Sequence, residues 1–427
     1  MVGVVENGGG VLEMTQQAYG RRWYFGWNIV AAASIVSLLA VGLRMGVGPL
    51  FLPITRDLGF SRSLLASIVA VGMLCYGIGM PVAGHLVNVR GTRWVMLLGT
   101  VMVDAAIVWT VFARDAWSFL FAFGVLLSFG LSFTSPVALT PVVSRWFTRQ
   151  RGMALFFLST GSMAGIAIVT PILAYAIQAV GWRGTLIGYA TVFTLLMLPM
   201  ALFVIRDDPP PHTDLHPSAI NAGASFAAAP SMAWRDAVRT MPFWKVGMGL
   251  FACGYSMNLL GTQGVPMLVD HGFDSMTSSF GIGLIGLVAI FSTVVLGRLS
   301  DIWPRKYILV AIYFIRGLGF FGLLLVATPA QLFTVAAVGG VVWAGSVSLS
   351  SAILADVYGT RIVGILYGWT YLIHQIGGMI SSWLGGWAYE RWGTHWVSFG
   401  SAGLLLLAAA AISLRLPKQG YTLCPAA

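Results

Sequence analysis

Charge is scarce in this chain of 427 residues: Asp, Glu, Lys and Arg make up only 9% of it. A soluble domain carries about 25% charged residues. Hydrophobic residues reach 58% and glycines number 52, as is common where helices pack closely within a membrane. These proportions exclude an ordinary soluble protein and indicate that a lipid bilayer surrounds most of the chain.

Cysteine is also rare. The three cysteines, Cys75, Cys253 and Cys424, are far apart, and the first two lie within apolar runs. This spacing excludes a disulfide framework and a cysteine-based metal site. The apolar runs carry no His/Glu metal cluster and no activated nucleophile. We therefore expect no catalytic residue, no metal and no cofactor, and a protein that is not an enzyme.

Basic residues exceed acidic ones, giving a net charge of +10, but the excess does not indicate nucleic-acid binding. No dense basic run with interleaved aromatics occurs, and the basic residues fall at the ends of apolar segments, where they set topology. With both termini on one side, that side holds 17 Lys and Arg and the opposite side holds 5. Both termini and the central linker are therefore expected in the cytoplasm.

Twelve apolar runs are long enough to span a bilayer, which takes about 20 residues. They cover residues 24–52, 63–86, 92–113, 117–144, 151–179, 184–205, 242–268, 278–300, 305–327, 331–355, 361–388 and 395–415. The segment between the sixth and seventh runs is rich in Pro, Ala and Ser and reads as a linker. The expected organisation is a tail (1–23), a first bundle (24–205), a linker (206–241), a second bundle (242–415) and a tail (416–427).

An internal repeat supports two related halves. Residues 84–93 and 297–306 each combine a small residue, a polar turn and a basic end, in the same order, about half a chain apart. The sequence thus predicts an all-α membrane protein with twelve transmembrane helices in two pseudo-symmetric six-helix bundles. This organisation is typical of secondary transporters.

The repeated segment resembles the loop signature of the major facilitator superfamily. Its second copy matches the signature at Gly297, Leu299, Ser300, Asp301, Arg305 and Lys306, and its first copy at Gly84, Leu86, Gly91 and Arg93, with Asn88 in place of the usual Asp. The resemblance covers the chain except its tails and linker. It implies the fold of that family, transport by alternating access, a monomer, and a multi-pass protein of the plasma membrane, here the inner membrane of a bacterial cell.

Further segments are similar to the monocarboxylate and oxalate/formate porter branch of this family. They include 145–154, which opens the fifth span, and 265–272 in the seventh. That branch often carries an Asp and an Arg in its eighth helix. Here the eighth helix has no buried charge, and Thr293 stands near the expected arginine.

The signature loops are candidate gates on the cytoplasmic side. Small Gly84 and Gly297 would let neighbouring helices approach closely. Asp301 could accept hydrogen bonds from a helix N-terminus or an arginine, whereas Asn88 cannot ionise, so the first latch is expected to be weaker. The alternative is that the basic residues only fix topology. The expected gate residues are Asn88, Arg93, Asp301 and Arg305.

Three charged residues and one histidine lie deep within spans: Arg44, Asp104, Arg316 and His374. An ionisable group in the bilayer is costly and marks function by default. Arg44 is the candidate anion anchor, because a guanidinium stays charged and grips carboxylates in a bidentate fashion; otherwise it pairs with a neighbour or snorkels outward. Asp104 and Arg316 are expected to be structural, with Asp104 as a proton-coupling alternative. His374 is the other proton-coupling candidate, or a neutral buried histidine.

Polar residues also recur at helical spacing on spans that would line a central cavity. Such stripes either bind a substrate or join helices by hydrogen bonds. With Arg44, the expected substrate-binding set is Ser132, Tyr255, Asn258, Gln263, Trp343, Tyr371 and His374.

The favoured function is alternating-access transport of a small organic anion, such as the monocarboxylates lactate and pyruvate. Proton symport is expected with it, because one proton per carboxylate cancels the charge that the membrane potential opposes. The alternative is export of drug-like or hydrophobic compounds, which the 13% aromatic content allows. A sensor or an intramembrane enzyme is disfavoured, since the chain shows no soluble signalling domain or catalytic cluster.

Overall fold

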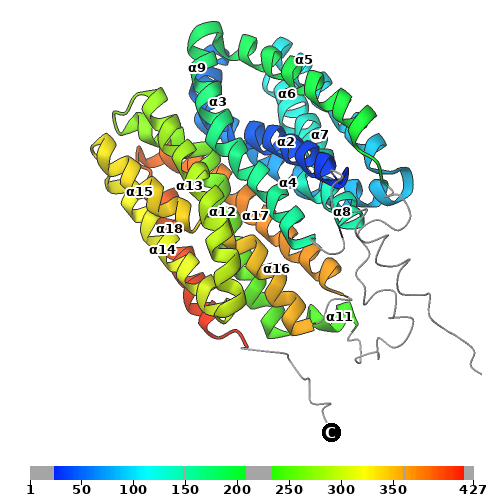
Figure 1. Cartoon of the computed structure of the whole chain (residues 1–427). Helices are drawn as coiled ribbons and strands as arrows, with labels where there is room; N and C mark the ends of the chain where they lie inside the picture. Colours follow the sequence, from blue (N-terminus) through cyan, green and yellow to red (C-terminus); the bar gives the residue numbers. More distant parts are fainter. Residues whose placement is uncertain (1–23, 148–150, 208–232, 359–361, 418–427) are drawn as a thin grey trace, which may run out of the picture.

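The computed structural model describes residues 24–147, 151–207, 233–358 and 362–417. In these ranges the chain folds into helices joined by short turns, with no strand. Figure 1 shows two bundles lying against each other, the N-terminal half in blue to green and the C-terminal half in yellow-green to red. The predicted division into two helical halves is thus visible in the structure.

The N-terminal half begins at Gly26. Its elements are α2 (Gly26–Met45), α3 (Val47–Leu58), α4 (Arg62–Arg90), α5 (Thr92–Phe112), α6 (Ala116–Phe119), the π-helical η1 (Leu120–Leu126), α7 (Leu127–Phe133), α8 (Pro136–Trp146), α9 (Arg151–Pro199) and η2 (Met200–Val204).

The C-terminal half follows the short helix α11 (Trp234–Ala237). Its elements are α12 (Met241–Asp270), α13 (Ser275–Ile302), α14 (Arg305–Leu325), α15 (Pro329–Val341), α16 (Gly345–Tyr358), α17 (Val363–Trp392) and α18 (Trp396–Leu414).

Twelve membrane crossings account for these elements. In the described part of the chain, nine helical stretches are long and apolar enough to span a bilayer. One of them, 153–204, holds two crossings that meet at Gly181, where φ is 72°. The remaining two crossings are α12 and α17, each 30 residues long and less apolar because they carry buried polar side chains. The expected number of spans is confirmed.

The first crossing differs from the prediction because it is broken. It was expected as one run over 24–52, but α2 ends at Met45 and α3 continues to Leu58. Pro49 explains the break, since proline cannot donate a hydrogen bond to the carbonyl four residues earlier and its ring crowds that carbonyl. Gly46 fits the joint, where a Cβ atom would lie 2.3 Å from Leu173.

The fourth and tenth crossings are broken as well. The fourth stops at Phe133 and resumes at Pro136, with Ser135 extended at ψ 160° as the residue before a proline prefers. The tenth stops at Val341 and resumes at Gly345, which leaves Trp343 between two helices. Broken helices at membrane depth occur where side chains or a cavity satisfy the freed backbone.

Each half has its own apolar core. One cluster of buried side chains joins α2 to the first half's other helices, and a second lies mainly in the C-terminal half, with Met45 and Ile166 of the first half at its edge. On the outside, many large apolar side chains remain exposed, which would be unfavourable in water but suits lipid. Examples are Trp94, Phe112, Trp117, Phe203, Phe291 and Leu404.

Glycines let equivalent helix pairs touch in the two halves. A Cβ atom on Gly165 of α9 would lie 2.4 Å from the carbonyl oxygen of Leu38 on α2. In the second half, a Cβ atom on Gly377 of α17 would lie 2.3 Å from the carbonyl oxygen of Phe251 on α12. The fifth span therefore packs on the first as the eleventh packs on the seventh, in accord with the internal repeat.

The signature glycines behave differently from the prediction. A Cβ atom on Gly84 or Gly297 would meet no other atom within 4 Å, so the expected close helix approach at these two positions is wrong for this conformation. Gly91 is the glycine that the backbone requires, because its φ is 85° and a Cβ atom would strike the Asp207 carboxylate at 2.6 Å. That carboxylate accepts from the Thr92 amide at 2.9 Å and caps α5.

Candidate functional site

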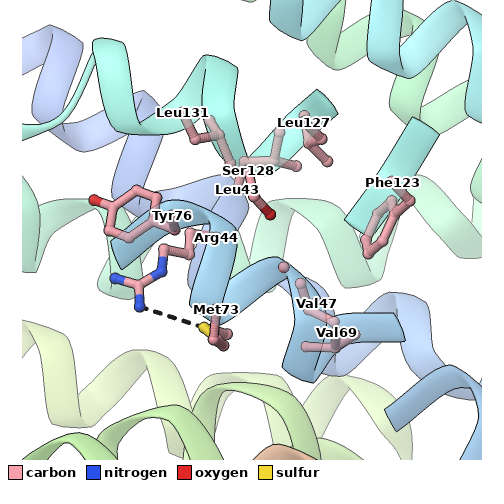
Figure 2. A pocket seen from close by; sticks show the side chains of 11 residues that line it. Leu43, Arg44, Val47, Val69, Met73, Tyr76, Phe123, Leu127, Ser128 and Leu131 are labelled. Atoms are coloured by element: carbon pink, nitrogen blue, oxygen red, sulfur yellow. Dashed lines mark hydrogen bonds between the residues drawn. The ribbon is translucent and has the colours of Figure 1, made fainter. Parts of the chain in front are cut away.

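Arg44 lies at the junction of the two halves, near the end of α2, and is only 9% exposed. Its Nη2 atom donates to the side-chain oxygens of Asn258 and Gln375, each at 2.9 Å. Met73 Sδ lies 3.3 Å from the same nitrogen, as Figure 2 shows. The guanidinium carbon stands 4.0 Å above the ring of Tyr76. One cation of the first half is therefore held by two amides of the second.

No carboxylate neutralises Arg44 within the described residues. The four ion pairs formed there involve other groups, and Arg44 Nε has no hydrogen-bond partner among the described side chains and backbone. Neutral amides and an aromatic face stabilise a cation less than an anion does. A buried charge without a counterion is costly, so the site is electrostatically prepared to accept an anion.

The local packing of α12 and α17 aims the two amides at Arg44. A Cβ atom on Gly254 would lie 1.9 Å from the carbonyl oxygen of His374, and one on Gly378 would lie 2.3 Å from Asn258 Nδ2. Only glycine allows the two backbones this close. Asn258 Nδ2 donates to the Gly254 carbonyl at 2.8 Å, which fixes the amide so that its oxygen is left for Arg44.

A cavity opens beside Arg44 within the first half. It lies between α2, α4, η1 and α7. Figure 2 shows Arg44 and Tyr76 at one side of this space and Phe123 at the other. The lining residues are Leu43, Arg44, Val47, Val69, Gly72, Met73, Tyr76, Phe123, Leu127, Ser128 and Leu131.

His374 and Tyr371 lie next to this site on α17. Their rings stack with centroids 4.9 Å apart. His374 is 3% exposed, neither ring nitrogen has a hydrogen-bond partner among the described residues, and the ring lies within electrostatic range of Arg44 and Arg316. Tyr371 also interacts with Arg44. Of the predicted binding set, Arg44, Asn258, Tyr371 and His374 thus come together.

Four other members of the predicted set lie elsewhere. Ser132 bonds the Phe129 carbonyl and fills the contact between α7 and α4 at Gly79. Tyr255 shares a hydrogen bond of 2.8 Å with Ser401 on α18. Gln263 is 1% exposed and packs against α17. Trp343 stacks on Arg316 instead of reaching Arg44.

Arg316 forms a second buried cationic centre, wholly inside the C-terminal half. It is 1% exposed, and its guanidinium carbon stands 4.1 Å over the Trp343 ring. Its Nη1 atom has only long contacts, to Cys253 Sγ at 3.4 Å and Ser346 Oγ at 3.5 Å. Nε and Nη2 find no acceptor within the part of the chain that the structure describes.

Asp104 lies apart from both arginines, between the third and sixth spans. It accepts a hydrogen bond from Thr194, and its other oxygen has no partner among the described groups. Asp104 therefore lies at a contact between two helices of the N-terminal half and away from the Arg44 site.

The predicted cytoplasmic gate is visible only in part. The side chains of Asn88 and Asp301 lie outside those that the structure describes. Arg93 donates to the Ile205 carbonyl at 3.2 Å, and Arg305 pairs with Asp356 at 2.7 Å. Both contacts stay within one half, so in this conformation neither arginine joins the halves.

A polar cluster at the opposite end of the molecule does join the halves. Arg62, at the start of α4, pairs with Asp270, at the end of α12, through contacts of 2.5 and 2.9 Å. His395 contacts the same carboxylate at 2.9 Å through Nε2. Nearby, the Ser63 amide donates to Glu390 at 2.9 Å. We call Arg62, Asp270 and His395 the outer cluster.

The outer cluster also sets the charge of its members. Burial raises the pKa of Asp270, but the hydrogen bonds and charge of Arg62, with help from His395, outweigh it and lower the pKa to about 2. Burial lowers the pKa of His395, although Asp270 offsets part of this effect. At neutral pH, therefore, a neutral imidazole donates to an ionised carboxylate that a guanidinium also holds.

Sequence reasoning missed several of these residues. Tyr76 and Met73 contact Arg44 but sit in an apolar run, where their types carry no signal. Gln375 follows His374 in the sequence and is a direct Arg44 partner. Arg62 stands just before an apolar run, where a basic residue indicates topology and nothing more. The pairing of Arg62 with Asp270, some 208 positions away, has no sequence pattern that would disclose it.

Several known proteins are similar to this chain over most of its length. The model of a family described as the Major Facilitator Superfamily matches residues 30–344 and 287–422. The chain is 27% identical over 407 residues to the uncharacterized MFS-type transporter YcxA of Bacillus subtilis (strain 168), covering 90% of this chain and 91% of that one. It is also 27% identical over 415 residues to human monocarboxylate transporter 11, covering 92% and 83% respectively.

Solved structures show the same fold. A bacterial homolog of the human lysosomal transporter Spinster, described in an inward-facing and unoccupied conformation, matches with a TM-score of 0.66. The match covers 93% of this chain and 95% of that one at 14% identity, so it concerns the fold alone. It confirms the predicted fold class.

Proposed function

The chain belongs to the major facilitator superfamily of membrane transporters, and on this premise we propose that it carries a small organic anion with Arg44 as the anchor. A monocarboxylate of the kind represented by lactate and pyruvate fits this anchor. The observation that carries the proposal is the burial of Arg44 without a counterion among the described residues. A relative named as a monocarboxylate transporter supports the substrate class.

A carboxylate would complete the site chemically. A guanidinium binds carboxylates through two parallel hydrogen bonds, which are about twice as strong as neutral ones. Arg44 Nε has no partner among the described groups, and Nη2 is held only by neutral acceptors. An incoming carboxylate can therefore bond Nε and displace an amide oxygen from Nη2, so that substrate takes the place of weaker internal contacts.

The same exchange couples binding to movement of the halves. Asn258 and Gln375 belong to the C-terminal half and Arg44 to the N-terminal half. A carboxylate that takes over Nη2 loosens one link between them. The outer cluster supplies another link at the end that we assign to the outside. We propose that the halves rock about the Arg44 level and that the outer cluster opens when the site faces outward.

The position of His374 supports proton symport as part of the proposal. A proton on this imidazole is repelled by Arg44 and Arg316, which lie within electrostatic range. A carboxylate at Arg44 cancels one of those charges, so anion and proton favour each other's binding. Tyr371, stacked on the imidazole, would contact both. Asp104 is the second proposed proton carrier, although it lies away from the site.

The arrangement in the membrane is proposed from the charge distribution. We place both tails (1–23 and 416–427) and the linker (206–241) in the cytoplasm of a monomer in the bacterial inner membrane, with bundles at 24–205 and 242–415. The gate residues Asn88, Arg93, Asp301 and Arg305 would then face the cytoplasm. In the alternate state Arg93 and Arg305 would exchange their present contacts for contacts across the halves.

Export of hydrophobic compounds is the second candidate function. The mainly apolar lining of the cavity beside Arg44 favours it. An exporter of this kind would move dyes without needing Arg44, whereas an anion carrier depends on that residue.

Counterflow in proteoliposomes distinguishes the two functions. Vesicles loaded with unlabelled lactate or pyruvate should accumulate the labelled acid, faster with an inward proton gradient, and Arg44→Ala should abolish the exchange. Arg114→Ala is the matched control, because Arg114 is exposed outside the spans and should leave exchange unchanged. Dye efflux without any acid exchange would contradict the anion proposal.

A further inference from the structure

The cavity beside Arg44 has two unlike ends. At one end stand the guanidinium and the ring of Tyr76 (Figure 2). The remainder is bounded by branched, sulfur-containing and aromatic side chains, with Ser128 as the one hydroxyl apart from Tyr76. The apolar lining residues are Leu43, Val47, Val69, Met73, Phe123, Leu127 and Leu131. We call the space that these side chains enclose the apolar chamber.

Backbone packing keeps the chamber floor free of side chains. Gly72 of α4 faces η1 and α7, where a Cβ atom would lie 2.7 Å from Ser128 Oγ and 3.0 Å from the Gly124 carbonyl oxygen. The helices on either side are thus as close as they can come. Val69 and Leu127 are each 4% exposed and Phe123 is 6% exposed, so the chamber wall is a packed core surface.

A chamber of this composition selects its occupant. Lactate, pyruvate and dicarboxylates would place a hydroxyl, a carbonyl or a second charge against apolar walls, and an unpaired polar group there is costly. A methylene group gains about 0.8 kcal/mol on leaving water, which is about a fourfold gain in affinity. Apolar side chains make up most of the lining, so carbons beyond the carboxylate would meet apolar atoms on most sides.

We infer that the transported anion is a monocarboxylate with an apolar tail, either a medium-chain or branched alkanoate or an arylalkanoate. Its carboxylate lies on Arg44 and its tail fills the apolar chamber. This inference rests on the proposed function and names the substrate class of the same site.

A homologous series tests it on the purified full-length protein by calorimetric titration. Acetate, butanoate, pentanoate and hexanoate should bind with affinities that rise about fourfold per methylene. Phenylacetate should bind tightly, succinate weakly, and lactate measurably but less tightly than butanoate. Hexanamide, which has the tail without the charge, should bind far more weakly than hexanoate, and Arg44→Ala should remove the difference between them.

Two variants of the chamber wall act in opposite directions. Val69→Phe should erase the gain from butanoate to hexanoate while acetate binds as before. Phe123→Ala should extend the gain to octanoate. Val101→Phe is the matched control for the first, because Val101 is 64% exposed on the lipid side and should change nothing. Should Val69→Phe fail to fold, the Phe123→Ala variant and the parent series still decide the question.

The outcomes separate this inference from the proposed function. Lactate binding that depends on Arg44, with hexanoate no tighter and Val69→Phe without effect, would overturn the chamber inference alone. If no carboxylate binds at all, the proposed anion transport fails first. Hexanoate and hexanamide binding equally well, with or without Arg44, would show mere partition into apolar surface and overturn the inference too.

Discussion

Arg44 and Arg316 are two buried arginines in similar surroundings. Each is at most 9% exposed, each stands about 4 Å over an aromatic ring, and neither pairs with a carboxylate within the described residues. Arg44, however, lines a cavity and reaches two amides of the opposite half. Arg316 does not line this cavity, and its weak contacts stay in its own half.

The difference shows that burial of a charge is not enough to define a transport site. A buried cation becomes useful to a carrier when a ligand can reach it and when its internal contacts cross the moving interface. Arg44 lines the cavity and contacts the opposite half. Arg316 does neither in this conformation, which suits a cation that orders the broken tenth span around Trp343.

The largest expected effect separates the two arginines directly. Arg44→Ala should weaken binding of a monocarboxylate at least about 100-fold, because two charge-assisted hydrogen bonds are lost, worth together about 3 kcal/mol. Arg316→Ala should change affinity by less than about threefold and act on thermal stability instead, since it removes a ring contact from the core. Calorimetric titration and thermal unfolding of both variants check this.

The comparison breaks if the two variants lose affinity alike. That result would move Arg316 into the binding site. A normal affinity in Arg44→Ala, with Arg316→Ala inactive, would exchange their roles altogether.

The amide partners of Arg44 give the next largest effect. Asn258→Ala should raise anion affinity about tenfold, because the anion no longer competes with an internal hydrogen bond worth about 1.5 kcal/mol. The ligand-free variant should unfold at a lower temperature than the ligand-free parent. Gln263→Ala is the matched control, since Gln263 is also a buried amide of α12 but makes no hydrogen bond to Arg44 among the described residues. Weaker binding in Asn258→Ala would instead make the amide a direct substrate ligand.

Release of the outer cluster should have a smaller effect. Asp270→Asn removes an ion pair whose side chains are 22% and 16% exposed, so we expect about 1 kcal/mol, or a fivefold shift toward the outward-open state. A cysteine replacing Leu52, one helical turn beyond the interface residue Gly48, should then react faster with an impermeant maleimide from outside. The three natural cysteines would be replaced beforehand.

Asp57→Asn is the control for this measurement, because Asp57 pairs with Arg183 within the first half only. Equal labelling rates in the parent and in Asp270→Asn would show that the outer cluster does not hold the halves together.

The smallest effect is the pH dependence of the outer cluster. The pKa of Asp270 is lowered to about 2 when the halves are joined, so its contribution is complete above 3.8 and is lost as pH falls toward 2. The pKa of His395 is also lowered, so its contribution is complete above 6.5 and fades below it. Acid should therefore favour opening in both ranges.

Between pH 6.5 and 5 His395 is the titrating member of the outer cluster, and maleimide labelling of the Leu52→Cys protein should rise as pH falls through this range. His395→Gln should flatten this part of the profile and leave the change below pH 3.8 in place. Labelling that slows in acid would contradict the assigned charges.

The sequence predicted the fold well because lipid leaves few choices. Twelve apolar runs and a repeated loop sufficed to predict two six-helix halves. The breaks within three of the spans were harder to predict. Pro49 and Pro136 signal two of them in retrospect, but no proline lies at the break beside Trp343, where tertiary packing decides.

Residues of the candidate site could be predicted where burying their side chain in lipid costs free energy, and not elsewhere. Arg44 and His374 stand out as ionisable groups in spans. Tyr76 looks like any core aromatic, and only its place under the guanidinium gives it a role. Ser132 and Tyr255 share the helical spacing of a cavity stripe, yet they serve contacts between helices, because spacing fixes a face and not what that face meets.

The most direct measurement is a structure of the protein with a bromoalkanoate bound, in which the bromine marks the tail. The account predicts the carboxylate within hydrogen-bond distance of Arg44 Nε and Nη2, with Asn258 or Gln375 displaced and the bromine in the apolar chamber. A carboxylate bound at Arg316, or Arg44 still held by both amides with ligand elsewhere, would contradict the central claim.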